Sequence, residues 1–514
     1  MSRLQRSPRD PIGRCAIHLR NRGLAGPTLG DLPAQPAYPS GRRGLQARRD
    51  NATVSSPLID DLRAVVGAAH VLTGELAAGF ERDWTDRFGG PARAVVRPAD
   101  RSEIESVLSI CRREQAPVIP QGGNTGLVGG SVPRSAATGH DGPVVISTGR
   151  LTGIGHLDPV SGQIEVQAGV TLAALQDALR GSGWRFGVDL GARDRATIGG
   201  MIATNAGGLH VVAHGMMRRQ ILGIEAVLAT GRVLRRLDGL AKDNTGYDLV
   251  GLLCGSEGTL AMVTAARVRL IPEPAERVVA LLGVASIDDA VSLSGRLRRC
   301  DGIEAIEVFG ADEAELAAAH GNLDRPFRPW PPVMVLAEAA GSDPATRLHQ
   351  AVAAHDAVLE VAVATTPAAS RNLWAIRELI TDALLPLGPV LKLDVTLPTA
   401  GVPTFLSALQ PLVTAQEPTA RVWVFGHLGD GNLHLNLTDH ATDEAAERAL
   451  TDTILTLVAE HHGSISAEHG IGVAKRPWLH LSRSGDELAT MKAIKDALDP
   501  DHLMNPGVLL PERS

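Results

Sequence analysis

Residues 422–437, VWVFGHLGDGNLHLNL, carry two apolar stretches around a central Asp430-Gly431 pair. An Asp-Gly pair tolerates the positive φ angles of tight turns, so the pattern predicts two strands joined as a hairpin. With a turn of residues 430–431 or 429–432, His427 lies directly opposite His434. The Cβ atoms of such a pair are about 4.5 to 5.5 Å apart. Both imidazoles can then reach one metal ion.

The same hairpin has one apolar and one polar face. Leucines at positions 433, 435 and 437 point to one side, which leaves His434 and Asn436 on the other. A third ligand is offered by Glu468 in SISAEHGIG (464–472). Two histidines and one carboxylate form a common divalent-metal triad with an open position for substrate. His469 is then the candidate general base, and the alternative is that these histidines only fill polar positions on a wet sheet.

The bulk composition describes a globular protein of two or three domains. The chain has 514 residues, of which 44% are hydrophobic and 21% charged. A net charge of −7 and 3% aromatic residues give no reason to expect nucleic-acid binding. No stretch approaches the length of a membrane span. Four cysteines, far apart and without a CxxC pair, indicate a reducing compartment. We therefore expect a cytoplasmic, bacterial-type location rather than the mitochondrial matrix.

Residues 1–55 are rich in Arg, Pro and Gly and are expected to form a disordered extension. Beyond them, LIDDLRAVVGAAHVLTGELAAGF (58–80) predicts short helices. ARAVVRP (92–98) and APVIP (116–120) predict strands, and a helix opened by Ser102 separates them.

Three glycine-dense loops, each joined to an apolar strand, occur in the first half of the chain. They are QGGNTGLVGGS (121–131), GVDLGARDRATIGGMIATNAGG (187–208) and GSEGTLAMV (255–263). Glycine lets backbone N–H groups approach phosphate oxygens closely. None carries a Rossmann register or a Walker lysine. Three such loops fit a long ligand such as a dinucleotide, held between two lobes.

The composition changes near residue 275, where we place a domain boundary. In the second half, RNLWAIRELITDALL (371–385) predicts one helix with Arg377 and Thr381 on the same face. The strand PVLKLDVTLP (389–398) carries Lys392. If Arg377 and Lys392 converge on the hairpin, they form a carboxylate clamp.

Several long motifs resemble the vanillyl-alcohol oxidase / p-cresol methylhydroxylase (PCMH) flavoprotein superfamily. PQGGNTGLVGGSVP, TIGGMIATNAGG, KDNTGYDL and GSEGTL are similar to its FAD-binding domain, and GHLGDGNLHLN, SAEHGIG and DPDHLMNPGVLLP to its FAD-linked oxidase C-terminal domain. The resemblance implies an α+β fold. It predicts a two-lobed PCMH-type FAD-binding domain over residues 56–275 and a C-terminal domain with an antiparallel sheet and flanking helices over 276–511.

The resemblance also implies the roles of individual residues. His427, His434 and Glu468 match ligands of a divalent metal, usually zinc. The substrate contacts match Arg377, Thr381, Lys392, Asn436 and His469, the last as catalytic base. One departure is His214, where the family commonly has tyrosine before the glycine. Noncovalently bound FAD is expected to contact Pro120, Gly122, Gly123, Asn124, Thr125, Gly126, Gly130, Ser131, Thr197, Gly200, Asn205, Gly207, Gly208, Glu257, Gly258, Val263 and Asn505.

The expected reaction is oxidation of a D-2-hydroxy acid by hydride transfer to flavin N5. A lysine in addition to the arginine suits a dicarboxylate, which favours D-2-hydroxyglutarate, giving 2-oxoglutarate, over D-lactate or glycolate. The resemblance suggests electron-transferring flavoprotein or a quinone-linked carrier as electron acceptor, and a homodimer is possible. The alternative from another class is a metal-dependent hydrolase with the glycine-rich half as a nucleotide sensor.

Overall fold

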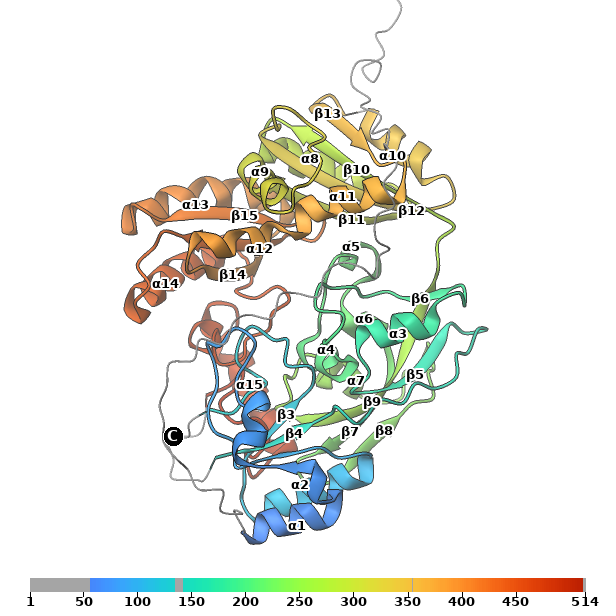
Figure 1. The fold of residues 1–514 in the computed structure, drawn as a ribbon, viewed down its shortest axis with the longest axis vertical. Helices are drawn as coiled ribbons and strands as arrows, with labels where there is room; N and C mark the ends of the chain where they lie inside the picture. The colour runs from blue at the N-terminus through green and yellow to red at the C-terminus, as the bar shows by residue number, and fades with distance from the viewer. Residues whose placement is uncertain (1–55, 135–141, 354, 512–514) are drawn as a thin grey trace, which may run out of the picture.

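The chain folds into two lobes joined by a continuous backbone (Figure 1). The computed structural model describes residues 56–134, 142–353 and 355–511. The expected disordered extension, 1–55, lies outside the described residues.

The first lobe contains two sheets that share one hydrophobic core. The first sheet has the strand order β1-β2-β4-β3, in which β2, β3 and β4 are parallel. The helix α2 connects β2 to β3, as expected for parallel strands. Asp100, not Ser102, caps its helix α2, because the Asp100 side chain accepts the Glu103 N–H. The elements are α1 (Pro57–Val66), η1 (Ala68–His70), β1 (Val71–Leu72), η2 (Gly74–Phe80), β2 (Ala94–Val96), α2 (Arg101–Arg113), β3 (Val118–Gln121) and β4 (Val144–Ser147).

The second sheet is antiparallel, with β9 at its centre between β5 and β7. The elements are β5 (Gln163–Gln167), α3 (Leu172–Leu179), β6 (Trp184–Phe186), α4 (Ile198–Thr204), α5 (Val211–His214), α6 (Met217–Gln220), β7 (Ile221–Leu228), β8 (Val233–Arg236), α7 (Leu249–Leu253) and β9 (Ala261–Pro272).

The second lobe is built on a seven-stranded sheet of order β13-β10-β12-β11-β15-β16-β14, with all neighbours antiparallel. Its strands are β10 (Glu276–Val284), β11 (Ile303–Gly310), β12 (Val333–Gly341), β13 (Val358–Val363), β14 (Leu391–Thr396), β15 (Arg421–His427) and β16 (Asn432–Thr438).

The two faces of this sheet are packed differently. One face is apolar from edge to edge and is covered by α8 (Ile287–Leu297), α10 (Pro344–Ala353), α13 (Val402–Gln416) and α14 (Glu444–Glu460). The other is covered by α9 (Ala311–His320), α11 (Pro367–Glu378) and α12 (Ile380–Leu384) over β10, β12 and β11. Toward β15, β16 and β14 that second face becomes polar. The remaining short helices are η3 (Leu385–Leu387), η4 (Thr399–Gly401) and η5 (Arg476–Leu481).

The end of the chain returns to the first lobe, where Figure 1 shows α15 (Gly485–Leu498). The Val118 N–H donates to the Leu503 carbonyl, and the Asn505 N–H donates to the Val118 carbonyl. The C-terminal segment therefore extends the first sheet beside β3. The passage from one lobe to the other lies between the end of β9 and the start of β10, and the domain limits drawn from the sequence stay a prediction.

The predicted hairpin is present as β15 and β16, but its register was wrong. His427 pairs with Asn432, and His434 pairs with Phe425. The loop consists of residues 428–431, one position earlier than expected, because the Asp430 and Gly431 N–H groups both bond the His427 carbonyl. A shift by two positions in the pairing keeps both histidines on the same face. They are diagonal neighbours with ring centroids 5.3 Å apart.

The helix predicted over 371–385 is also interrupted. α11 ends at Glu378 and α12 begins at Ile380, with Leu379 between them. Arg377 and Thr381 therefore belong to two successive helices rather than to one face of a single helix.

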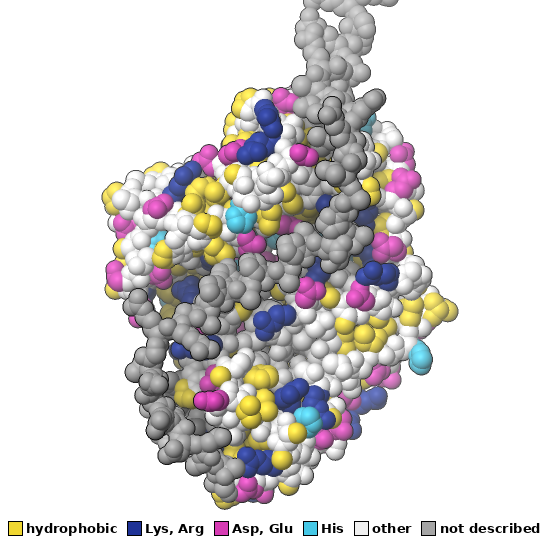
Figure 2. Space-filling view, in the orientation of Figure 1, with side chains coloured by type: hydrophobic (Ala, Val, Ile, Leu, Met, Phe, Trp, Pro, Cys, Tyr) yellow, Lys and Arg dark blue, Asp and Glu magenta, His cyan; other side chains and the backbone are white. Residues whose placement is uncertain are grey.

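Basic and acidic side chains are interspersed on the face of the molecule in Figure 2. No single-sign field covers that view, which agrees with the modest net charge of −7. Within the described residues, no helix has the length and apolar character needed to cross a bilayer.

Candidate active site

The polar half of the sheet aligns ionisable side chains from four adjacent strands. Glu307 on β11 pairs with His427 on β15, and Asp394 on β14 pairs with His434 on β16. Because side chains alternate along a strand, all four lie on one face. Leu433 and Leu435 point to the opposite face, into the core, as predicted.

Each histidine turns Nδ1 toward a fully buried carboxylate. His427 Nδ1 lies 2.7 Å from Glu307 Oε1, and His434 Nδ1 lies 3.6 Å from Asp394 Oδ1. Both carboxylates have 0% exposure. A histidine that donates Nδ1–H to a carboxylate keeps Nε2 for a metal, which is the usual arrangement of metal-binding imidazoles.

The electrostatics of the two histidines differ. Burial lowers the pKa of His427, but the charge and hydrogen bond of Glu307 raise it more, to about 9. Burial lowers the pKa of His434 well below its usual value, and the neighbouring charge of His427 lowers it further. A divalent cation bound between the rings would replace the proton of His427 and release it.

Asp394 fixes the segment that carries Glu468 and His469. Its Oδ2 accepts the backbone N–H groups of residues 467–469 at 2.9 to 3.1 Å, and its Oδ1 accepts from Asn432. Glu468 Oε1 then lies 4.0 Å from His434 Nε2 and 4.0 Å from His469 Nε2. Sequence reasoning missed Asp394, because nothing in LKLDVT shows that this aspartate reaches a loop more than seventy residues away.

One group of four side chains is compact enough to hold an ion: Asp394, His434, Glu468 and His469 have ligand atoms within 4.8 Å of one another. His434 and Glu468 were predicted ligands. His427, the third, is outside this group, although its ring is next to that of His434. Both Asp394 oxygens already accept hydrogen bonds from N–H groups. His434 and His469 turn Nδ1 toward Asp394 and leave Nε2 available for an ion. The donor set fits a divalent metal held by histidine and carboxylate.

Two predicted substrate residues have donors without protein partners. Asn436 is 3% exposed, and its Nδ2 has no hydrogen-bond partner among the described residues. Lys392 is directly opposite Asn436 in the sheet. Lys392 is half-buried, burial lowers its pKa, and its ammonium forms no ion pair within the described residues. A buried donor without a partner is costly, so the Asn436 amide favours a ligand at this position.

Arg377, at the end of α11, lies over the same polar face of the sheet. Its Nε donates to Glu307 at 2.9 Å, and its guanidinium lies 4.8 Å from the Phe425 ring centroid. This is the one hydrogen bond of Arg377 to a described residue, which leaves both terminal nitrogens for a bidentate contact. Thr381 is half-buried on α12, without a hydrogen bond to the described residues.

The glycine-dense loops meet one another and the candidate metal group. A Cβ on Gly122 would lie 2.4 Å from the Thr197 hydroxyl, and one on Gly123 only 1.7 Å from the Arg195 carbonyl oxygen. Any side chain at Gly123 would therefore displace the backbone. A Cβ on Gly207 would lie 3.4 Å from Glu468, so the second loop reaches the carboxylate of the other lobe.

Other predicted cofactor residues bind these loops together. Asn505 Nδ2 donates to the Gly130 and Glu257 carbonyls, and the Glu257 carboxylate accepts the N–H groups of Ile471 and Gly472. Burial raises the pKa of Glu257. The remaining predicted cofactor residues have structural contacts of their own. The Asn124 amide accepts a hydrogen bond from the Ser131 hydroxyl and donates one to the Arg82 carbonyl, and the Thr125 carbonyl accepts one from the Trp84 indole. Thr197 and Asn205 are the N-cap and C-cap of α4, and Val263 lies in β9.

The remaining glycines differ in the space around them. A Cβ on Gly200 would contact Thr197, and one on Gly258 would contact Pro120. Gly208 has a φ of +114°, and a Cβ on Gly126 would meet no atom within 4 Å.

A second ionic cluster joins the lobes away from this site. Glu304 and Glu338 from the second lobe meet His210 from the first, and their ligand atoms lie within 4.8 Å of one another. Arg277 bonds Glu304 at 3.0 Å and Glu338 at 2.8 Å. Arg185 also pairs with Glu304. These guanidiniums already neutralise the carboxylates, so the cluster is structural rather than a metal site.

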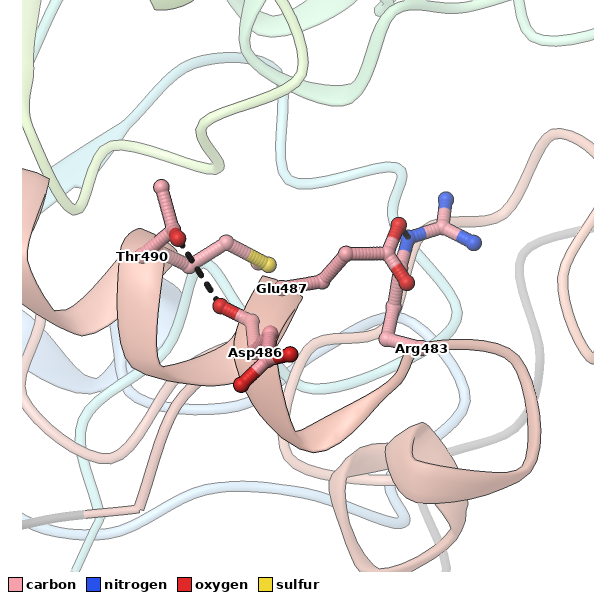
Figure 3. Close-up of a pocket in the computed structure, with 5 residues that line it drawn as sticks. Arg483, Asp486, Glu487 and Thr490 are labelled. Atoms are coloured by element: carbon pink, nitrogen blue, oxygen red, sulfur yellow. Dashed lines mark hydrogen bonds and ion pairs between the residues drawn. The ribbon is translucent and has the colours of Figure 1, made fainter.

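A surface hollow of about 410 Å³ at the start of α15 is also separate from the site (Figure 3). It is lined by Arg483, Asp486, Glu487, Thr490 and Met491. The ion pair of Arg483 with Glu487 and the bond of Thr490 to the Asp486 carbonyl are ordinary contacts of a helix end.

Sequence comparisons decide the family. Residues 92–236 match the family described as FAD binding domain, and residues 273–509 match FAD linked oxidases, C-terminal domain. A D-2-hydroxyglutarate dehydrogenase of Xanthomonas citri is 37% identical over 84% of this chain and 92% of its own. The mitochondrial enzyme of Bos taurus is 34% identical, covering 95% and 92%. The chain belongs to the FAD-linked oxidases.

Within this family the chain is an FAD-dependent D-2-hydroxy-acid dehydrogenase. The assignment favours the flavoenzyme over the metal-dependent hydrolase. Another relative, 33% identical over 83% of each chain, is named a putative mitochondrial D-lactate dehydrogenase of Schizosaccharomyces pombe.

Solved structures agree on the FAD-linked oxidase fold. p-Cresol methylhydroxylase with substrate bound has a TM-score of 0.70 at 15% identity, covering 88% of this chain and 96% of its own. Alkyldihydroxyacetonephosphate synthase has a TM-score of 0.67 at 18% identity, covering 88% and 85%. The predicted PCMH-type two-domain α+β fold is confirmed.

Proposed function

We propose that this dehydrogenase oxidises D-2-hydroxyglutarate to 2-oxoglutarate with noncovalent FAD and a divalent metal, which the histidine-carboxylate donor set favours as Zn²⁺. The observation that supports the proposal is the unpartnered Nδ2 of buried Asn436, directly opposite Lys392 on the sheet face over which Arg377 contacts Glu307. Relatives named D-2-hydroxyglutarate dehydrogenase support it.

His427, His434 and Glu468 would hold the metal. When bound, FAD supplies a hydride acceptor and the metal supplies a Lewis acid that lowers the pKa of the substrate hydroxyl. Glu307 and Asp394 orient the two imidazoles from behind. A Cβ on Gly207 would lie 3.4 Å from the Glu468 carboxylate, so the proposed metal ligands are next to the loops proposed to bind FAD.

His469 is the proposed base for the 2-hydroxyl proton. The His469 Nδ1 lies 3.8 Å from Asp394 Oδ2, so this buried carboxylate can stabilise the protonated form of His469. The backbone N–H of His469 donates to the same carboxylate, which limits movement of this residue relative to Glu468.

Two cationic groups favour a dicarboxylate substrate. We assign the distal carboxylate to Arg377, Thr381 and Lys392, and the amide of Asn436 to the end of the substrate that reacts. A monocarboxylate such as D-lactate would leave the half-buried Lys392 ammonium without a counter-charge, so it should bind less well.

Electron-transferring flavoprotein or a quinone-linked carrier is the proposed electron acceptor, and a homodimer the proposed assembly. We propose a cytoplasmic location, because the described cysteines, Cys111, Cys254 and Cys300, are all free.

A panel of D-2-hydroxy acids tests the substrate. With an artificial dye as acceptor, kcat/KM should be highest for D-2-hydroxyglutarate and should fall when a chelator removes the metal. Readdition of Zn²⁺ should restore it. A preference for D-lactate would support the function named for the fission-yeast relative instead, and chelator-resistant turnover would remove the metal from the proposal.

A further inference from the structure

Glu307 on β11 connects the proposed metal ligand His427 to Arg377, which is proposed to bind the substrate carboxylate. Its side chain has 0% exposure. Oε1 lies 2.7 Å from His427 Nδ1, and Oε2 accepts Arg377 Nε at 2.9 Å. One carboxylate therefore bonds one predicted metal ligand and one predicted substrate residue, and neither bond was expected from the sequence.

The two bonds have separate consequences. An ionised carboxylate only accepts hydrogen bonds, so the proton between it and His427 belongs to Nδ1, and Nε2 is the atom available to a metal. Burial raises the pKa of Glu307, but the charges of His427 and Arg377 lower it more, which keeps the carboxylate ionised. The Arg377 guanidinium is held between Glu307 and the Phe425 ring. Its plane and its free nitrogens are thereby fixed.

We propose that Glu307 is a positioning residue that sets the tautomer of His427 and the orientation of Arg377 together, so that metal retention and substrate binding depend on the same carboxylate. This inference rests on the proposed function. It adds a residue that touches neither the substrate nor the cofactor.

The substitution Glu307→Gln separates positioning from packing. An amide has one acceptor and one donor, and the Arg377 N–H requires the acceptor. The NH₂ group then faces His427 Nδ1, which must accept, so the ring proton moves to Nε2. The variant keeps the shape of the side chain but presents an N–H where a metal ligand needs a lone pair.

The test uses the zinc-loaded, FAD-containing protein in a chelator competition, with bound zinc counted per flavin. Glu307→Gln should weaken zinc retention by about 10- to 100-fold, the range found when a group that orients a metal ligand is changed. The KM for D-2-hydroxyglutarate should rise several-fold, while flavin content stays at the wild-type value.

Glu313→Gln is the matched control. Glu313 is also buried, on neighbouring α9, and its carboxyl accepts the Val424 N–H at 3.0 Å, a bond that an amide oxygen can also accept. This control should retain zinc and keep the wild-type KM. Equal zinc loss in the two variants, or none in Glu307→Gln, would overturn the inference.

Glu307→Ala distinguishes the tautomer from general loss of structure. Alanine removes the acceptor that glutamine still offers to the Arg377 N–H and leaves a cavity, so this variant should be less stable than Glu307→Gln, yet His427 is free to adopt either tautomer. Zinc retention should be better in Glu307→Ala than in Glu307→Gln, and the reverse order would contradict the inference. If Glu307→Ala does not fold, the comparison with Glu313→Gln decides.

A wild-type protein that binds no zinc would reject the proposed function together with this inference, whereas a zinc-dependent wild type with a normal Glu307→Gln variant would reject the inference alone.

Discussion

At the level of single residues, the site is defined by which polar groups have partners. Asp394 and Glu307 are fully buried and use both oxygens of their carboxylates. Lys392 and Asn436 lie on the same sheet face without an acceptor among the described residues. The contrast between satisfied anions and unsatisfied donors is what indicates an anionic ligand.

Replacing Lys392 with methionine tests the choice of a dicarboxylate. Methionine keeps most of the volume but removes the charge, and a lost hydrogen bond to a charged group costs about 1.5 to 3 kcal/mol. We expect kcat/KM for D-2-hydroxyglutarate to fall about 10- to 100-fold and to change much less for D-lactate. Steady-state kinetics on both substrates measure this, with exposed Lys492→Met as control. Equal losses on both substrates would remove the basis for the dicarboxylate.

His434→Ala tests the metal role. Turnover should be abolished and bound zinc lost, because His434 is a proposed ligand whose Nε2 lies 4.0 Å from Oε1 of the proposed ligand Glu468. The protein should remain yellow, since the proposed FAD contacts lie in the first lobe. Metal analysis, visible absorbance and kinetics check the three expectations, and His349→Ala, an exposed change on α10, is the control. Normal turnover in His434→Ala would exclude this histidine as a ligand.

At the level of elements, the segment 464–472 depends on two carboxylates from different strands and loops. Asp394 holds its middle, and Glu257 from the first lobe holds Ile471 and Gly472 at 2.8 Å each. The segment has no regular structure of its own beyond an isolated bridge between Ser464 and Thr396. Its conformation is therefore set by the surrounding protein.

Glu257→Gln should loosen this segment. The amide can accept only one of the two N–H groups, so the other is left unsatisfied, and the free energy of unfolding should fall by about 1 to 3 kcal/mol. Denaturant unfolding and limited proteolysis near residue 471 would detect the change, with exposed Glu487→Gln compared under the same conditions. Unchanged stability and protection would argue against Glu257 as the anchor.

The sequence predicted elements better than contacts between them. Alternation, glycine loops and the Asp-Gly turn are local signals, and they identified the hairpin, β14 and the glycine-dense loops. The hairpin register was wrong because the choice of residues 428–431 as the loop depends on long-range contacts: the Gly429 N–H bonds the Ile306 carbonyl, and Gly431 packs on the Leu397 carbonyl. Glu307 and Asp394 were missed for the same reason, since each acts on residues distant in the chain.

At the level of the whole molecule, an ionic cluster holds the two lobes together beside α5. It contains Arg185, His210 and His214 from the first lobe and Arg277, Glu304 and Glu338 from the second, with Trp374 bonding Glu338. His214, where the family commonly has tyrosine, lies 3.5 Å from Glu304. The departure from the family therefore lies at the interface between the lobes.

This cluster predicts sensitivity to acid. Burial raises the pKa of Glu304, but the hydrogen bond from His214 and the charges of Arg185 and Arg277 lower it more, to about 2. The folded pKa of Glu304 is below its unfolded value of about 4.3. The stability that ionised Glu304 contributes is therefore fully present above the unfolded pKa and is lost as pH falls toward 2. Stability measured from pH 6 to pH 3 should fall more steeply for wild type than for Glu304→Gln. Parallel curves would contradict the assignment.

The most direct test of the account is anaerobic reduction of the purified protein's flavin by D-2-hydroxyglutarate, followed by visible absorbance with and without prior removal of metal. We predict rapid bleaching of the metal-loaded protein, little bleaching after chelation, and recovery when Zn²⁺ is added back. Equal bleaching of the loaded and chelated protein, or no bleaching by this substrate in either, would contradict the proposed site.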